Sequence, residues 1–131
     1  MGMYVSAAQY SEQYYNRALR VRSQIRQDFD DAFTNVDILL TPTTPSSAFK
    51  IGGVYGDSVM MQYADQLVVT GNHAGVPGIS IPAGFDQDDM PIGIHFFAPD
   101  FREDLLFRAG FAYERATETE PWREKRPVSL V

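Results

Sequence analysis

A serine in a glycine- and proline-flanked stretch is the first candidate for chemistry in this chain. The stretch reads Gly78-Ile79-Ser80-Ile81-Pro82. A hydrolytic serine needs a sharp turn, an activating base and an oxyanion hole, and this stretch lacks the G-x-S-x-G pattern. The alternation around Ser80 predicts instead that it lies within a strand. His73 is the one base that could reach Ser80, but no acid is placed to orient its imidazole. We therefore expect no catalytic serine–histidine–acid triad here.

The spacing of histidines, acids and glycines in the sequence does not support a metal site or a phosphate site either. The two histidines, His73 and His95, stand on separate elements without metal-ligand spacing. The acids at 86–89 resemble a calcium loop, but the glycine and the closing glutamate of that loop are absent, so a solvated turn explains them. The glycines of "KIGGVYG" are in the wrong order for a phosphate-binding loop. We therefore predict no metal site.

Composition describes a globular, acidic, cysteine-free chain. It has 131 residues, 44% hydrophobic residues, a formal net charge of −6 and no cysteine. The negative charge argues against direct contact with a nucleic-acid backbone, which requires clustered Lys and Arg. The missing cysteines favour a reducing, cytoplasmic setting. No basic-then-apolar leader is present, and no apolar run approaches the roughly 20 residues that a membrane span needs.

The N-terminal third predicts one long helix and one buried strand. An apolar stripe at Tyr14, Ala18, Val21, Ile25 and Phe29 indicates a helix over about 4–33. The acids near its end oppose the helix dipole, so we expect a break near residue 30. The apolar run over 36–40, which a proline ends, is typical of a strand buried on both faces.

The remainder predicts a helix, a hairpin and a final helix. A helix is expected over 57–74, followed by two alternating segments around 79–81 and 92–96 that form an antiparallel hairpin. A helix over about 103–117 comes next, and residues 121–131 form a polar tail that we expect to be poorly ordered. The order of helices and strands indicates layered α/β packing. A strand buried on both faces normally has neighbours in a larger sheet, and three strands make only a small one. We expect the rest of the sheet to lie on polypeptide outside this sequence.

Four segments, in this order and spacing, resemble the C-terminal part of the amidase signature family. They are "SAAQYSEQYYNRALRVRSQIRQDFDDAF", "DILLTPTTPSSAFKIG", "YADQLVVTGNHAGVPGISIPAGFD" and "PIGIHFFAPDFREDLLFRAGFAYE". The resemblance covers about residues 2–118. It implies that residues 1–120 are the C-terminal portion of a layered α/β/α fold with a mixed sheet.

The resemblance also implies where the family's catalysis resides. Members use a serine nucleophile, a second serine reached through a cis peptide and a lysine base, all N-terminal to the part that resembles this chain. Lys50 and Lys125 match none of these positions. The expectation is therefore an amidase or glutamine amidotransferase as the parent enzyme, with this chain alone inactive.

Within the family, the likeness is greatest to the branch that forms the A subunit of tRNA-dependent amidotransferases, acting on glutamyl-tRNA(Gln) or aspartyl-tRNA(Asn). This branch releases ammonia from glutamine and works with the B and C subunits. ATP and magnesium belong to a partner subunit, and tRNA is met only through the complex. Asp65 matches the acid that holds the α-amino group of glutamine, Thr41–Thr43 match a loop bordering the pocket, and Asn72 matches a structural helix-end residue.

Two alternatives remain open beside this interpretation. The chain could belong to a stand-alone amide hydrolase of the same family, or it could be a non-catalytic α/β module that folds alone. His73 and His95 depart from the residues usual at these positions, which puts substrate preference in doubt if either lines the pocket. By itself, the chain is expected to self-associate through exposed apolar sheet surface.

Overall fold

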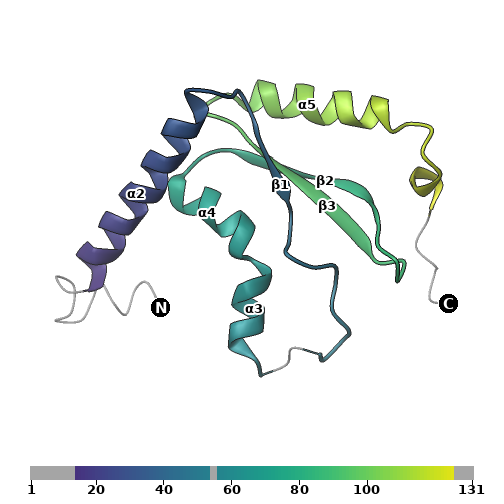
Figure 1. Ribbon diagram of the computed structural model, residues 1–131, viewed down its shortest axis with the longest axis horizontal. Helices are drawn as coiled ribbons and strands as arrows, with labels where there is room; N and C mark the ends of the chain where they lie inside the picture. Colours follow the sequence, from purple (N-terminus) through teal and green to yellow (C-terminus); the bar gives the residue numbers. More distant parts are fainter. Residues whose placement is uncertain (1–13, 54–55, 126–131) are drawn as a thin grey trace.

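A small antiparallel sheet with helices on both faces forms the centre of the chain (Figure 1). The computed structural model describes residues 14–53 and 56–125. Strand β3 (Pro91–Phe97) lies between β1 (Leu39–Pro42) and β2 (Gly78–Phe85). Helices α2 and α4 pack on one face and α5 on the other, so two small apolar clusters, one per face, make up the core.

Helix α2 (Asn16–Phe33) confirms the helix predicted from the apolar stripe, and residues 4–13 of that prediction lie outside the described residues. The predicted break near residue 30 is wrong. Arg26 lies one turn before Asp30 and donates to its carboxylate at 2.9 Å, which offsets the unfavourable dipole interaction. Only the C-terminal part of the stripe is covered, since Ile25 and Phe29 join the core whereas Val21 is 47% exposed.

The sheet confirms the predicted hairpin and corrects the expectation for the first strand. β2 and β3 pair antiparallel, with Ser80 opposite His95, and β1 pairs antiparallel with the other edge of β3. The parallel pairs of a mixed sheet are not present among the described strands. β1 lies at the sheet edge, so Leu40 is 60% exposed rather than buried as predicted.

The helix predicted over 57–74 is two helices. Asp57 caps α3 (Ser58–Ala64), because its carboxylate accepts from the N–H groups of Val59 and Met60. Asp65, with φ −96° and ψ −4°, then forms the turn between α3 and α4 (Gln66–Ala74). Aspartate is a poor residue for a helix interior, which fits a junction at this position. α4 ends at Gly75, whose φ of 79° suits a glycine cap.

Helix α5 (Glu103–Ala116) covers the opposite face, close to the predicted range. Leu106 is buried there, and Leu105 and Tyr113 pack beside it. The first residues of the predicted tail form a short 3₁₀ helix, η2 (Pro121–Glu124), in which the Arg123 guanidinium lies 4.4 Å from the centre of the Trp122 ring. Residues 126–131 lie outside the described residues.

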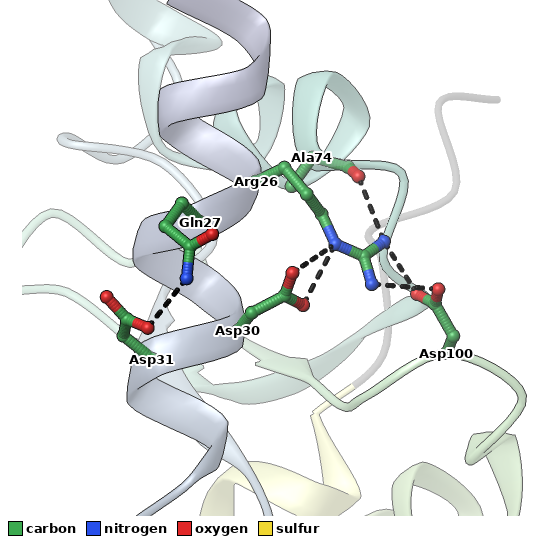
Figure 2. A network of polar contacts seen from close by, with 6 residues as sticks. All are labelled: Arg26, Gln27, Asp30, Asp31, Ala74 and Asp100. Atoms are coloured by element: carbon green, nitrogen blue, oxygen red, sulfur yellow. Dashed lines mark hydrogen bonds and ion pairs between the residues drawn. The ribbon is translucent and has the colours of Figure 1, made fainter.

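One polar network joins the elements around α2 (Figure 2). The Arg26 guanidinium donates two hydrogen bonds to Asp100, at 3.0 and 2.9 Å, and a longer one, 3.4 Å, to the Ala74 carbonyl. The Asp100 carboxylate, followed by that of Asp30, raises the pKa of Arg26. The network ties α2 to the end of α4 and to the turn that follows β3.

Among residues 14–53 and 56–125, no helix combines the length and apolar character that crossing a membrane requires.

Candidate functional site

A hollow of about 440 Å³ opens beside the hairpin and is the candidate site. Three parts of the chain line it: the loop that follows β1, the end of α3, and the adjoining stretches of β2 and β3. The lining residues are Thr43, Thr44, Ser46, Ser47, Ala48, Phe49, Ala64, Ser80, Ile81, Pro82, Pro91, Ile92 and Gly93. The lining mixes hydroxyl groups with apolar carbon, a surface suited to a small ligand that carries both.

A close approach between a loop and a strand shapes one wall of this hollow. The N–H of Thr43 donates to the carbonyl of Gly93 at 3.1 Å, which continues the β1–β3 pairing beyond Pro42. A Cβ at position 93 would lie 2.8 Å from the Thr43 hydroxyl oxygen, so any other residue there would displace the Thr43 side chain. The hydroxyls of Thr41 and Thr43 are buried and have no hydrogen-bond partner among the described residues.

Asp65, the predicted substrate-binding residue, lies at the junction of α3 and α4, directly after the lining residue Ala64. It is exposed, and its carboxylate makes no hydrogen bond or ion pair with any residue in the described part of the chain. It is both the last cap of α3 and the first cap of α4. The carboxylate is thus open to solvent, and Asp65 itself is not among the residues that line the hollow.

The other residues that the family resemblance singled out divide into two groups. Thr43 lines the hollow, whereas Thr41 and Pro42 belong to β1 and are not part of the lining. Asn72 is exposed on α4 and is also absent from the lining.

The structure brings together Ser80 and His95, a pair that sequence reasoning missed because it considered His73. The Ser80 hydroxyl oxygen lies 2.6 Å from His95 Nδ1 across the hairpin. A signal was present in the sequence. In the observed hairpin, large apolar residues stand opposite each other in the pairs Ile79–Phe96 and Ile81–Ile94. Aligning the two segments so that their large apolar residues pair in this way also places Ser80 opposite His95.

The environment of this pair favours a structural hydrogen bond over nucleophilic catalysis. His95 is buried, and burial lowers the pKa of its imidazole, so Nδ1 of the neutral ring can accept a hydrogen bond that the Ser80 hydroxyl donates. The ring packs edge-on against Phe97, with centroids 4.3 Å apart. No carboxylate within the described ranges contacts the imidazole to orient it, as a serine–histidine–acid triad requires.

His73 lies away from the hollow, on the last turn of α4. Its Nδ1 is 2.7 Å from the Val69 carbonyl oxygen, so Nδ1 carries a proton. Its own carbonyl accepts from Arg22 Nε, also at 2.7 Å. These are contacts of a helix end, and His73 does not line the candidate site.

Asp86 and Asp89 of the hairpin turn have partners within the turn, in the loop after β1 and just after η2. Asp86 accepts from the N–H groups of Asp88 and Met90, each at 2.9 Å. The pKa of Asp86 is lowered by the Ser47 hydroxyl first and then by the Met90 N–H. Asp89 forms an ion pair with Lys125, which also lies over the Phe85 ring. Among the described residues, no three metal-ligating side chains gather in one place.

Comparison with known proteins places this arrangement in a family. The Amidase family model matches residues 1–107. The A subunit of glutamyl-tRNA(Gln) amidotransferase from a Cyanothece species is 42% identical over 97% of this chain. The protein of the same name from Prochlorococcus marinus is 47% identical over 88% of it. The chain spans only 26% and 24% of these two relatives.

Solved structures agree with the sequence relatives. The crystal structure of the A subunit of glutamyl-tRNA(Gln) amidotransferase from Thermotoga maritima matches 87% of this chain with a TM-score of 0.76 and 34% identity, across 25% of its own length. The structure of 6-aminohexanoate cyclic dimer hydrolase matches 83% of this chain with a TM-score of 0.66 and 29% identity. The chain belongs to the amidase signature family.

Proposed function

We propose that this chain is the part of a glutamine-hydrolysing A subunit that supplies one wall of the glutamine pocket. The observation that carries the proposal is 42% identity to A-subunit relatives over 97% of the chain. In this proposal, the assembled enzyme cleaves the side-chain amide of glutamine and releases ammonia.

Asp65 holds the substrate's α-ammonium group in this proposal. A free amino acid carries a positive ammonium group that a plain aliphatic amide lacks, so a carboxylate at the pocket rim selects the amino acid. The exposure of Asp65 and its lack of a partner among the described residues leave it able to form that ion pair. The hydroxyl-rich loop that begins at Thr43 shapes the adjoining wall.

The reagents of the reaction come from elsewhere in the enzyme. The serine nucleophile, the second serine and the lysine base of the family are supplied by the part of the amidase length that this chain does not match. Ser80 and His95 order the hairpin and do not attack the amide. Glutamine hydrolysis by the isolated chain would contradict this division of roles.

Partners and cofactors follow from the same relationship. The B and C subunits complete the assembly, and ATP and magnesium act in a partner subunit, where the tRNA is also bound. We assign no cofactor to this chain.

A chimera tests the proposal. In it, this chain replaces the matched quarter of the Thermotoga maritima relative, and ammonia release from glutamine is measured. Asp65→Asn should raise KM by about 10–100-fold with little change in kcat, because it removes one charged hydrogen-bond partner of the substrate. Asp28→Asn, at an exposed position on α2, is the control and should leave KM unchanged. An unchanged KM in the Asp65 variant would refute the assigned role.

A second candidate is a stand-alone amide hydrolase. It is favoured by the structural match to 6-aminohexanoate cyclic dimer hydrolase, with a TM-score of 0.66. In that case the chimera should cleave an aliphatic amide without an α-amino group at least as well as glutamine, and Asp65→Asn should not alter the preference.

A further inference from the structure

Ser80 brings a hydroxyl group to the wall of the hollow, and a buried histidine holds that hydroxyl from behind. Ser80 is exposed and lines the hollow, whereas His95, opposite it on β3, is 9% exposed. The 2.6 Å contact between Ser80 Oγ and Nδ1 is the only side-chain hydrogen bond of this imidazole within the described ranges. The ring has little room to turn, because it contacts Phe97 and a Cβ on Gly78 would lie 2.5 Å from its Nε2.

The protonation of this ring decides what the hydroxyl can offer to a ligand. Burial lowers the pKa of the His95 imidazole, so the ring is neutral at pH 7. A neutral imidazole has one N–H and one acceptor nitrogen, and in water its proton favours Nε2. Nδ1 is then the acceptor, and the Ser80 hydroxyl donates its single proton to it. The lone pairs of Oγ remain for the hollow, so Ser80 can accept a hydrogen bond from a ligand but has no proton left to donate.

We propose that Ser80 selects a carboxamide over the corresponding carboxylate in the hollow, with His95 as its positioning residue. The –NH₂ of an amide donates to Ser80 Oγ, whereas a carboxylate brings only acceptors towards the lone pairs of that oxygen. Apolar carbon of Ile81, Pro82 and Ile92 lines the hollow as well and suits the aliphatic part of the ligand. The inference rests on the proposed function for the identity of the ligand: the amide is that of glutamine, and the carboxylate is that of the product, glutamate.

The acidity of the whole chain is a competing explanation for any preference against a carboxylate. A formal net charge of −6 repels every anion, whichever group lines the hollow. The two explanations differ in the effect of Ser80→Ala, because this substitution removes the hydroxyl and leaves the charge of the chain unchanged. A preference caused by Ser80 falls in this variant, and a preference caused by net charge does not.

Propionamide and propionate are the probes, because they share a carbon skeleton and differ only in the terminal group. Each is titrated into the isotope-labelled full chain, and nitrogen NMR gives the Kd from the shifts of residues that line the hollow. Propionamide should bind about 10-fold more tightly than propionate, as expected when one hydrogen bond is made or lost. The same spectra should show Nδ1 of His95 as an unprotonated nitrogen whose signal moves when propionamide binds.

Four variants test the two roles separately. Ser80→Ala should lower the preference for propionamide about 10-fold, and Ser80→Thr, which keeps a hydroxyl and suits a strand, should restore most of it. Ser23→Ala is the matched control and should leave the preference unchanged, because its hydroxyl bonds to the Leu19 carbonyl on the exposed surface of α2. His95→Phe keeps a ring but frees the Ser80 proton, so propionate should bind more tightly. A histidine that only supports the fold would not produce that gain.

The outcomes separate the role of Ser80 from the proposed function. A protonated Nδ1, no binding of propionamide, equal binding of the two probes, or a preference that survives Ser80→Ala overturns the role of Ser80. In the chimera, Ser80→Ala should raise KM for glutamine and lower the inhibition constant of glutamate, with little change in kcat. Hydrolysis of glutamine with neither constant altered overturns the role of Ser80 and leaves the proposed function standing. A chimera that does not hydrolyse glutamine, beside a chain that prefers propionamide through Ser80, refutes the proposed function and leaves the selection of the amide standing.

Discussion

Replacing Gly71 with alanine should destabilise the chain, although the same change favours most helices. Gly71 is buried in α4, against the ring of Phe97 at the end of β3. A Cβ there would lie 2.1 Å from Cε1 of Phe97, and two more ring carbons would be within 2.9 Å. Phe97 has little room to retreat, since its ring contacts Phe29 at a centroid distance of 5.5 Å and His95 at 4.3 Å.

The size of the effect follows from two opposing contributions. Alanine gains about 1 kcal/mol of helix propensity over glycine. Forcing an extra methyl group into a packed core costs about 1–3 kcal/mol, and so short a contact belongs at the upper end of that range. The free energy of unfolding of Gly71→Ala should therefore fall by about 2 kcal/mol.

Gly110→Ala is the matched control. Gly110 is also a buried helix glycine, but its added Cβ would meet only Ile81 Cγ2, at 4.0 Å. This variant should gain about 1 kcal/mol, because the propensity term is not opposed.

Urea denaturation of the full chain measures the change in stability of both variants. Unfolding is detected by circular dichroism and by the fluorescence of the single tryptophan. With a slope of about 1–3 kcal/mol per M, Gly71→Ala should lower the midpoint by about 1 M and Gly110→Ala should raise it. Equal or greater stability of the Gly71 variant would refute the packing of α4 against Phe97.

Two further predictions concern polar groups. Asp100→Asn removes the two-pronged contact with Arg26 and should lower the free energy of unfolding by about 0.5–1 kcal/mol, because solvent partly screens side chains that are 39% and 35% exposed. In thermal melts, this loss of stability should become smaller at high salt. The control variant Asp28→Asn should show no such loss. Burial lowers the pKa of His95 below its usual 6.5, so the unfolded chain binds the proton first and stability should fall as pH drops through about 6.5. His95→Gln, which keeps a partner for Ser80, should flatten that slope, and an unchanged slope would show that another group causes it.

The periodicity of apolar residues predicted the helices and strands correctly where the apolar side of an element is also the side that packs against the sheet. The hairpin of β2 and β3 and the bounds of α5 follow from alternation and from a helical stripe that faces the sheet. The division at Asp65 was missed because the apolar positions on either side continue one helical pattern. The spacing of apolar residues shows which face of a helix is covered, and a one-residue junction between two helices barely alters that spacing.

The candidate site could be predicted only in part, because its residues come from separate parts of the chain. The choice of Asp65 came from family resemblance, since an exposed acid on a helix is otherwise ordinary. The Ser80–His95 contact depends on strand register, because a slip of one residue would turn one strand over and leave the two side chains on opposite faces of the sheet. The hollow depends on the loop after β1 returning to Gly93, a contact between residues 50 positions apart that no local pattern encodes.

The disagreement between apolar pattern and exposure carries physical information of its own. The run that ends in Leu39 and Leu40 has the composition of a strand covered on both faces, yet Leu40 is 60% exposed at a sheet edge. The apolar residues of α3 show the same excess of hydrophobicity over burial. In both places the side chains are more exposed than their apolar character predicts. Both places belong to a chain that covers about a quarter of the length of its relatives. Hydrophobic residues on an exposed edge or helix carry a risk of aggregation, so under the proposed function we expect both surfaces to be covered in the assembled enzyme.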